Sequence, residues 1–213
     1  MLQTIKDGEW VSSWYQQRLR EFGVDPRGVG YNQRSSQQKR FELLSQLGGF
    51  DGRRVLDVGC GFGDFFQFLL EKEIQPDYTG LDLVPDMVAK CNERFKSHLG
   101  PHCRFESGDT LQYRPATKFD YVVACGIFGL RSENAKERIV PTLQRFFSWC
   151  TAGVAVNFLS QRADRHDPKC LYVDPAEILT HALVMTPSVK VVHNYLPNDF
   201  TLYMYRTPAW EQK

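Results

Sequence analysis

Long hydrophobic runs are absent from this sequence, and their absence excludes a protein with a membrane-spanning helix. No apolar stretch in the 213 residues approaches the roughly 20 that such a helix needs. The first ten residues, MLQTIKDGEW, also lack the apolar core of a signal peptide. We therefore expect a cytoplasmic protein with no membrane partner.

An excess of positive charge is also missing. The 26 basic and 25 acidic residues nearly cancel and leave a formal net charge of +1. Proteins that hold nucleic acid through its phosphates carry a clear basic surplus, so we expect no nucleic-acid partner. The chain shows no internal repeat and no low-complexity tract. Its length suits one α/β domain with a substantial core.

Paired metal-ligand motifs are likewise absent. The six cysteines are scattered without a Cys-x-x-Cys pair, and we expect them to be reduced, which agrees with a cytoplasmic protein. His98, His102 and Cys103 lie close together but do not have the spacing of a zinc site. We expect surface histidines and no bound metal.

The most informative segment is RRVLDVGCGFGD, residues 53–64. A short apolar run ends at three glycines, Gly59, Gly61 and Gly63, and an apolar-rich segment of helical length follows them. A strand, a glycine turn and a helix in this order let the backbone approach a ligand closely. Asp57 adds an acceptor beside the turn, and Cys60 lies within it. The segment predicts a ligand site after the first strand of the core.

This segment resembles the first motif of the class I S-adenosylmethionine (SAM) methyltransferases. The nearest rival is the dinucleotide-binding turn G-x-G-x-x-G. In this chain the last position of the rival pattern is Asp64, whose charge would face a pyrophosphate at a helix N-terminus. A plain glycine turn is the third interpretation. We favour the methyltransferase.

A second strand is predicted over residues 78–83 and ends in Asp82, 23 positions after Gly59. An acidic residue at this place can accept hydrogen bonds from two ribose hydroxyls. NAD-binding proteins share the position, so it supports a nucleoside without naming it. The resemblance also places Leu83 and Met87 beside the cofactor.

Two further marks follow in the order that the family has. The resemblance places Gly108, Asp109 and Thr110 beside adenine, where the aspartate could accept from the amino group. An apolar strand over residues 119–126 then ends at Cys125, which in the family borders both cofactor and substrate.

An N-terminal arm over residues 1–50 precedes the core of residues 51–213. The arm carries two predicted helices with apolar stripes, and we expect four of their side chains to pack on the sheet: Trp14, Phe22, Phe41 and Leu44. The glycine-containing segment between the helices is typical of a lid that closes over a ligand. The resemblance implies that Tyr31 lies near the methionine end of SAM and that Arg40 pairs with its carboxylate.

The remaining elements alternate as in a doubly wound sheet. Asp174-Pro175-Ala176-Glu177 predicts a helix start, because it supplies a cap, a first-turn proline and an acidic third position. The strands predicted at 189–195 and 200–206 are too close for a parallel crossover and predict an antiparallel hairpin. The expected fold is therefore α/β: a doubly wound, seven-stranded, mostly parallel sheet with an antiparallel terminal strand, plus the N-terminal helical arm.

The resemblance implies an enzyme that transfers a methyl group from SAM to a small or medium-sized acceptor by in-line displacement and releases S-adenosylhomocysteine. No motif marks a general base, and we assign no catalytic residue. The amino-methylating signature Asn/Asp-Pro-Pro-Tyr is absent, since residues 124–127 read Ala-Cys-Gly-Ile. Two alternatives stay open: a non-catalytic SAM- or nucleoside-binding partner subunit, and a nucleotide-linked oxidoreductase. The sequence gives neither the acceptor nor the oligomeric state.

Overall fold

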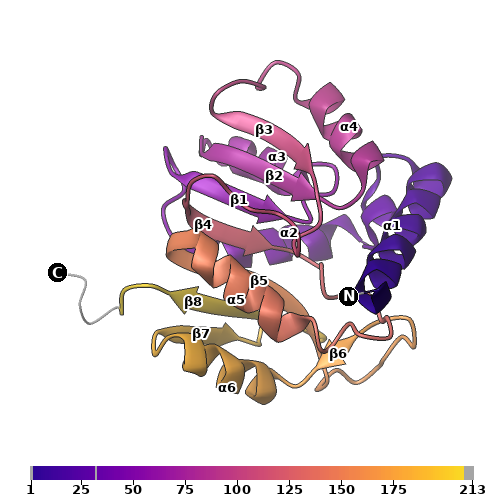
Figure 1. Cartoon of the computed structure of the whole chain (residues 1–213), viewed down its shortest axis with the longest axis vertical. Coiled ribbons are helices and arrows are strands. Elements are labelled where there is room, and N and C mark those ends of the chain that lie inside the picture. The colour runs from indigo at the N-terminus through magenta and orange to yellow at the C-terminus, as the bar shows by residue number, and fades with distance from the viewer. Residues whose placement is uncertain (1, 32, 209–213) are drawn as a thin grey trace.

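A single mixed sheet organises the chain (Figure 1). The computed structural model describes residues 2–31 and 33–208. Seven strands run in the order β3-β2-β1-β4-β5-β8-β7, and β6 pairs with β5 off this path. The strands are β1 (Arg54–Val58), β2 (Asp77–Asp82), β3 (Cys103–Ser107), β4 (Phe119–Ala124), β5 (Cys150–Ser160), β6 (Tyr172–Val173), β7 (Val189–Val192) and β8 (Asp199–Tyr205).

The expected sheet topology is confirmed. Strands β1 to β5 pair in parallel, whereas β8 is antiparallel to both β5 and β7. The hairpin forms because the six residues between β7 and β8 are too few for a crossover. β7 ends at Val192, three residues earlier than expected. The two-residue β6 is an addition that the sequence pattern did not indicate.

Helices occupy the positions that their starting residues indicate. They are α1 (Leu2–Phe22), α2 (Arg34–Leu44), α3 (Asp64–Glu71), α4 (Pro85–Arg94), α5 (Ile139–Trp149) and α6 (Pro175–Met185), with 3-10 turns η1 (Pro26–Val29) and η2 (Ser45–Leu47). Asp174 caps α6 by accepting a 2.9 Å hydrogen bond from the Ala176 N–H. The capping aspartate and the following proline therefore act as predicted.

Alternating strand residues divide the core into two layers. Val55 and Tyr78 point to the face covered by α2, α3 and α4. Leu56 and Val58 point to the opposite face, which α5 and α6 cover. Because successive side chains of a strand point to opposite faces, each buried parallel strand supplies apolar side chains to both layers.

The two helices of the arm differ in how they pack. Phe41 and Leu44 of α2 are buried in the core, as expected. Trp14 and Phe22 of α1 are only half-buried and lie outside the core clusters, so the expectation that they pack on the sheet is wrong. The guanidinium of Arg18 covers both rings instead, at 4.8 and 4.9 Å from their centroids.

Helix α1 lies beyond the carboxyl ends of the strands, and the arrowheads of β1 and β2 point toward it in Figure 1. It contacts mainly η1. Its half-buried Tyr15 and Leu19 pack against Phe62, Val84 and Met87 at those strand ends. None of the helices in the described part of the chain is long and apolar enough to cross a membrane.

Candidate functional site

A cavity opens at the carboxyl ends of β1, β2 and β4. It encloses about 1340 Å³ including its open mouth. Its wall is drawn from the arm, the glycine turn, the ends of β2 and β3, and the loop that joins β4 to α5. Parallel α/β sheets bind ligands at this edge.

The glycine turn after β1 forms the floor of the cavity. Gly59 and Gly61 both have left-handed backbone, with φ of 73° and 55°. A Cβ on Gly59 would collide with the side chain of Ile127, and one on Gly61 would lie 2.8 Å from a methyl group of Val29. The N–H groups of Gly59 and Cys60 donate to the carbonyl of Leu81, at 2.7 and 3.2 Å. The turn is therefore fixed to β2 and has no room for a side chain at Gly59 or Gly61.

Gly63 has a different role from its two neighbours. It has a φ of 72° and precedes α3, but it does not line the cavity. A Cβ there would lie 2.6 Å from the ring of Phe95. Gly63 therefore allows α3 to pack against the aromatic core, and the structure places this predicted cofactor residue behind the wall.

Asp82 ends β2 at the edge of the cavity. One of its carboxylate oxygens accepts a 2.8 Å hydrogen bond from the Gly61 N–H, and the other accepts a 2.9 Å bond from the Val84 N–H. Burial raises the pKa of this carboxyl, while the backbone bonds from Val84, Gly61 and Leu83 oppose the rise. The bonds fix the carboxylate beside the glycine turn and leave lone pairs for a ligand.

Asp57 lies under the turn in a drier setting. The hydroxyl of Tyr78 donates to it at 2.5 Å, and only 2% of the residue is exposed. Burial raises the pKa of Asp57 to about 7, although the hydrogen bond from Tyr78 acts in the opposite direction. Near neutral pH this wall residue therefore exchanges a proton.

The predicted adenine segment lies next to Asp82. The Gly108 N–H donates to the carbonyl of Asp82 at 2.8 Å, which joins the ends of β2 and β3. The Asp109 carboxylate accepts a 2.8 Å bond from the Leu111 N–H. Leu83, Met87, Gly108, Asp109 and Thr110 all line the cavity. The motifs that follow one another in the sequence therefore lie at the ends of the neighbouring strands β1, β2 and β3.

The arm forms the opposite wall. Val11 and Tyr15 of α1 line the cavity together with Val29 and Tyr31. The Tyr31 hydroxyl donates to the sulfur of Cys125 at 3.1 Å. Burial raises the pKa of both groups, for Cys125 to about 12. Both side chains therefore keep their protons at neutral pH.

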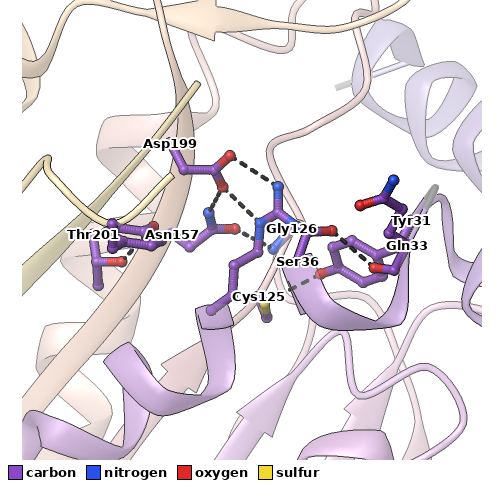
Figure 2. Close-up of polar contacts among 10 residues, drawn as sticks. Tyr31, Gln33, Ser36, Cys125, Gly126, Asn157, Asp199 and Thr201 are labelled. Carbon is purple, nitrogen blue, oxygen red and sulfur yellow. Dashed lines mark hydrogen bonds and ion pairs between the residues drawn. The ribbon is translucent and has the colours of Figure 1, made fainter. Parts of the chain in front are cut away.

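A buried network behind Tyr31 ties the arm to β5, to β8 and to the loop that follows β4 (Figure 2). Nε and Nη2 of Arg40 donate to Asp199 at 2.6 and 2.8 Å. Asn157 donates to the same carboxylate at 2.6 Å and accepts from the Gly126 N–H at 3.0 Å. The Arg40 guanidinium also lies 5.0 Å from the centroid of the Tyr31 ring. The network fixes the residue after Cys125 and the arm together.

Arg40 is therefore not on the cavity wall, where the resemblance places it. The carboxylate of Asp199 is fully buried and requires a buried cation, which Arg40 provides. The third guanidinium nitrogen, Nη1, is buried without a hydrogen-bond partner among the residues that the structure describes. The other predicted cofactor residues line the cavity, apart from Arg40 and Gly63.

Several wall residues were missed by the sequence analysis. Val11 and Tyr15 belong to the apolar stripe of α1. The helical period of this stripe predicted a helix, but it could not show which surface the stripe contacts. The loop after β4 adds residues in a stretch without a recognisable motif: Ile127, Leu130, Ser132, Ala135 and Arg138. Across residues 2–31 and 33–208, no group of three His, Cys, Asp or Glu side chains is arranged to hold a metal ion.

Comparison with known proteins identifies the family. A family model described as a methyltransferase domain matches residues 55–148, which include the glycine turn and all the cavity-lining residues outside the arm. Together with the relatives and solved structures described next, this match supports a class I SAM-dependent methyltransferase. The cofactor of this family is S-adenosylmethionine. The oxidoreductase alternative is excluded with this assignment.

Two relatives show how far the sequence similarity extends. Rv1506c of Mycobacterium tuberculosis, named as a methyltransferase, is 28% identical over 70% of this chain and 90% of its own length. Trans-aconitate 2-methyltransferase of Rhodopseudomonas palustris (strain BisB18) is 30% identical over 48% of this chain. That match spans only 39% of the relative, so the two share little beyond the methyltransferase core.

Solved structures extend the similarity of fold to nearly the whole chain. The magnesium protoporphyrin IX methyltransferase ChlM of Synechocystis PCC 6803, solved with SAM, has a TM-score of 0.70 and 16% identity. It covers 94% of this chain, and this chain covers 97% of it. The DhpI–SAM–HEP complex has a TM-score of 0.68 and 17% identity over the same shares. At these identities the likeness concerns the fold.

Proposed function

We propose that the cavity binds SAM and that the chain transfers its methyl group to a small or medium-sized acceptor. The observation that carries the proposal is the 2.8 Å hydrogen bond from the Gly61 N–H to the buried carboxylate of Asp82. It places an acidic strand end directly beside the glycine turn. When bound, SAM supplies a methyl group on a positively charged sulfur, already activated for transfer. The protein then has to hold, align and dehydrate the reactants.

We assign the nucleoside to the region between Asp82 and Thr110. Asp82 lies at the cavity edge and keeps lone pairs beyond those that the Gly61 and Val84 N–H groups engage, so it is placed to accept from two ribose hydroxyls. Asp109 and its neighbours at the end of β3 would border adenine. Leu83 and Met87 supply apolar surface for its ring. Gly59 and Gly61 let the backbone contact the ligand.

The charges of the wall favour a positively charged cofactor. Asp57, Asp64 and Asp82 all line this end of the cavity. SAM carries a sulfonium and an ammonium group against one carboxylate, so it has a net positive charge at neutral pH. Arg40 lies behind this wall as the counter-ion of Asp199, so we do not propose it as the partner of the methionine carboxylate.

The arm of residues 1–50 is proposed to act as the lid of the core. Val29 packs against the glycine turn, and Phe62 of that turn packs against Tyr15, Leu19 and Val29 of the arm. An apolar cover over the cofactor excludes water from the transferred methyl. The balanced charge and six free cysteines support our further proposal that the enzyme works in the cytoplasm.

Calorimetric titration of the purified chain tests the proposal. SAM and S-adenosylhomocysteine should each bind one site per chain, and NAD should not bind. Transfer of labelled methyl from SAM to a small-molecule extract should then separate an enzyme from a non-catalytic SAM-binding subunit. A chain that bound neither SAM nor S-adenosylhomocysteine would contradict the assignment of the cavity.

A further inference from the structure

We infer that the acceptor carries at least two carboxylates, one of which is bound by Arg138 while another is methylated to an ester. The inference rests on the proposed function, because it concerns the part of the same cavity that faces away from the nucleoside site. Its evidence is the distribution of charge and of titratable groups along the wall.

Arg138 is the only cation among the described residues that line the cavity. It forms the N-cap of α5 and makes none of the ion pairs found in the described part of the chain. The four wall carboxylates belong to Asp57, Asp64, Asp82 and Asp109, at the cofactor end. Asp64 is paired with Arg94, and bound SAM would offset the remaining negative charge, so an anionic acceptor is oriented by its attraction to Arg138.

The wall around Arg138 is otherwise apolar or weakly polar. It comprises Phe128, Leu130, Ser132 and Ala135. The loop that carries them is held by backbone bonds to the segment before β6: the Arg131 N–H donates to Lys169 at 2.9 Å, and the Leu171 N–H donates to Gly129 at 3.0 Å. A charged side chain on a braced, largely apolar wall is a specific anchor for one anionic group.

Among the wall residues that the structure describes, this end of the cavity has no suitable general base. From Cys125 to Thr142, the described wall residues include no histidine, lysine, aspartate or glutamate. The nearby hydroxyl of Tyr31 donates a hydrogen bond to the sulfur of Cys125. Burial raises the pKa of both groups, so neither is a base at neutral pH. An alcohol or ammonium acceptor requires removal of a proton. A carboxylate is already ionised at neutral pH and requires none.

The step balances without a proton. A carboxylate oxygen of the acceptor forms a bond to the methyl carbon while the methyl–sulfur bond breaks, and the electron pair of that bond stays on sulfur. The products are a methyl ester and S-adenosylhomocysteine. The carboxylate held by Arg138 cannot be the one that reacts, because pairing with the guanidinium would lower its nucleophilicity. Two carboxylates are therefore needed.

Binding to the chain saturated with S-adenosylhomocysteine tests the anchor. The probes are trans-aconitate, citrate and succinate, with benzylamine and catechol as acceptors of other chemistry. We expect at least one of the three acids to bind and Arg138→Gln to weaken it at least tenfold. Arg131→Gln is the matched control, since Arg131 is an exposed arginine of the same loop outside the cavity wall, and it should change affinity less than twofold.

The inference is overturned if all three acids fail to bind, or if their affinity is equal in Arg138→Gln and Arg131→Gln. Methyl label from SAM should appear in products that release it under mild alkali, as esters do. Alkali-stable label would overturn the inference as well. Binding of S-adenosylhomocysteine to the wild-type chain and to Arg138→Gln is measured first. If S-adenosylhomocysteine does not bind the wild-type chain, the proposed function is contradicted. If it binds but the acids do not, only the inference about Arg138 fails.

Discussion

The cofactor end of the cavity is made largely of backbone, whereas the opposite end is made of side chains from the arm and one loop. At the first end, the N–H groups of Gly59, Cys60 and Gly61 bind the end of β2. At the second, Tyr31 contacts Cys125, which lies 94 positions away in the sequence. One end is built from two adjacent strands and the other from distant segments that the fold brings together.

This difference has a physical consequence. A backbone site tolerates few sequences, because left-handed glycines and an acidic strand end have few substitutes. A side-chain site on loops can change its residues without disturbing the sheet. We therefore expect substitutions at the cofactor end to affect cofactor binding, and substitutions behind the arm to affect stability. The predictions below test this division, beginning with the largest effect.

Asp199→Asn should lower the free energy of unfolding by about 3–5 kcal/mol, because it leaves the buried Arg40 guanidinium without its counter-charge. Urea unfolding measures the change. The matched control is Glu42→Gln, which breaks the exposed Lys39–Glu42 pair on the same helix α2. That control should lose less than about 0.5 kcal/mol. Equal losses in the two variants would show that the buried network does not hold the arm.

Asp57→Asn should change how stability depends on pH. The pKa of Asp57 is about 7 in the folded chain and about 3.9 in an unfolded one. The folded state thus keeps a proton that the unfolded state releases, so wild-type stability falls as pH rises from about 4 to 7 and is constant above. The slope is up to about 1.4 kcal/mol per pH unit. Unfolding curves at several pH values should show this slope in the wild type relative to the variant, and parallel profiles would contradict it.

Gly61→Ala should weaken S-adenosylhomocysteine about a hundredfold, because the new Cβ lies 2.8 Å from Val29 and on the floor of the cavity. Gly52→Ala is the control: Gly52 has a φ of 65°, but a Cβ there meets nothing within 4 Å. Both variants carry the strain of a left-handed alanine, about 1–2 kcal/mol. Calorimetry should find a loss of affinity only in Gly61→Ala. A similar loss in both would attribute the effect to strain alone.

Asp82→Asn should weaken SAM and S-adenosylhomocysteine by about tenfold each, since a charge-assisted hydrogen bond contributes about 1.5–3 kcal/mol and both ligands have the same ribose. The amide is similar in size to the carboxylate, so the chain should remain folded. A loss confined to SAM would remove Asp82 from the ribose site, because the two ligands differ only at sulfur.

Much of the fold could be predicted because strong local signals agreed with the global arrangement. The glycine turn, the proline-initiated helices and the short link before β8 each act through backbone geometry that the residue types impose. The cofactor end followed from the same signals. Its motifs come in sequence order at the ends of neighbouring strands, and parallel strands bring such ends to one edge.

The opposite end was predicted only in part, through Tyr31 and Cys125, and the reasons are again physical. Nothing in the sequence pairs Arg40 with Asp199, 159 residues away, because a buried ion pair depends on the tertiary contact itself. Arg138 lies in a loop with no periodic pattern, and only the cavity gives it significance. The aromatic stripe of α1 indicated a helix correctly, but its period could not show that the stripe faces the arm and the cavity instead of the sheet.

Hydrogen exchange with and without S-adenosylhomocysteine tests the central claim most directly, because it locates the ligand and the lid in one measurement. We predict that the ligand protects amides at residues 59–63, 82–84 and 108–110, together with the arm around Val29 and Tyr31, while β5 and β8 are unchanged. Protection of the first three segments with an unchanged arm would contradict the proposal that the arm acts as a lid. The account as a whole would be contradicted if the ligand left all three segments unprotected.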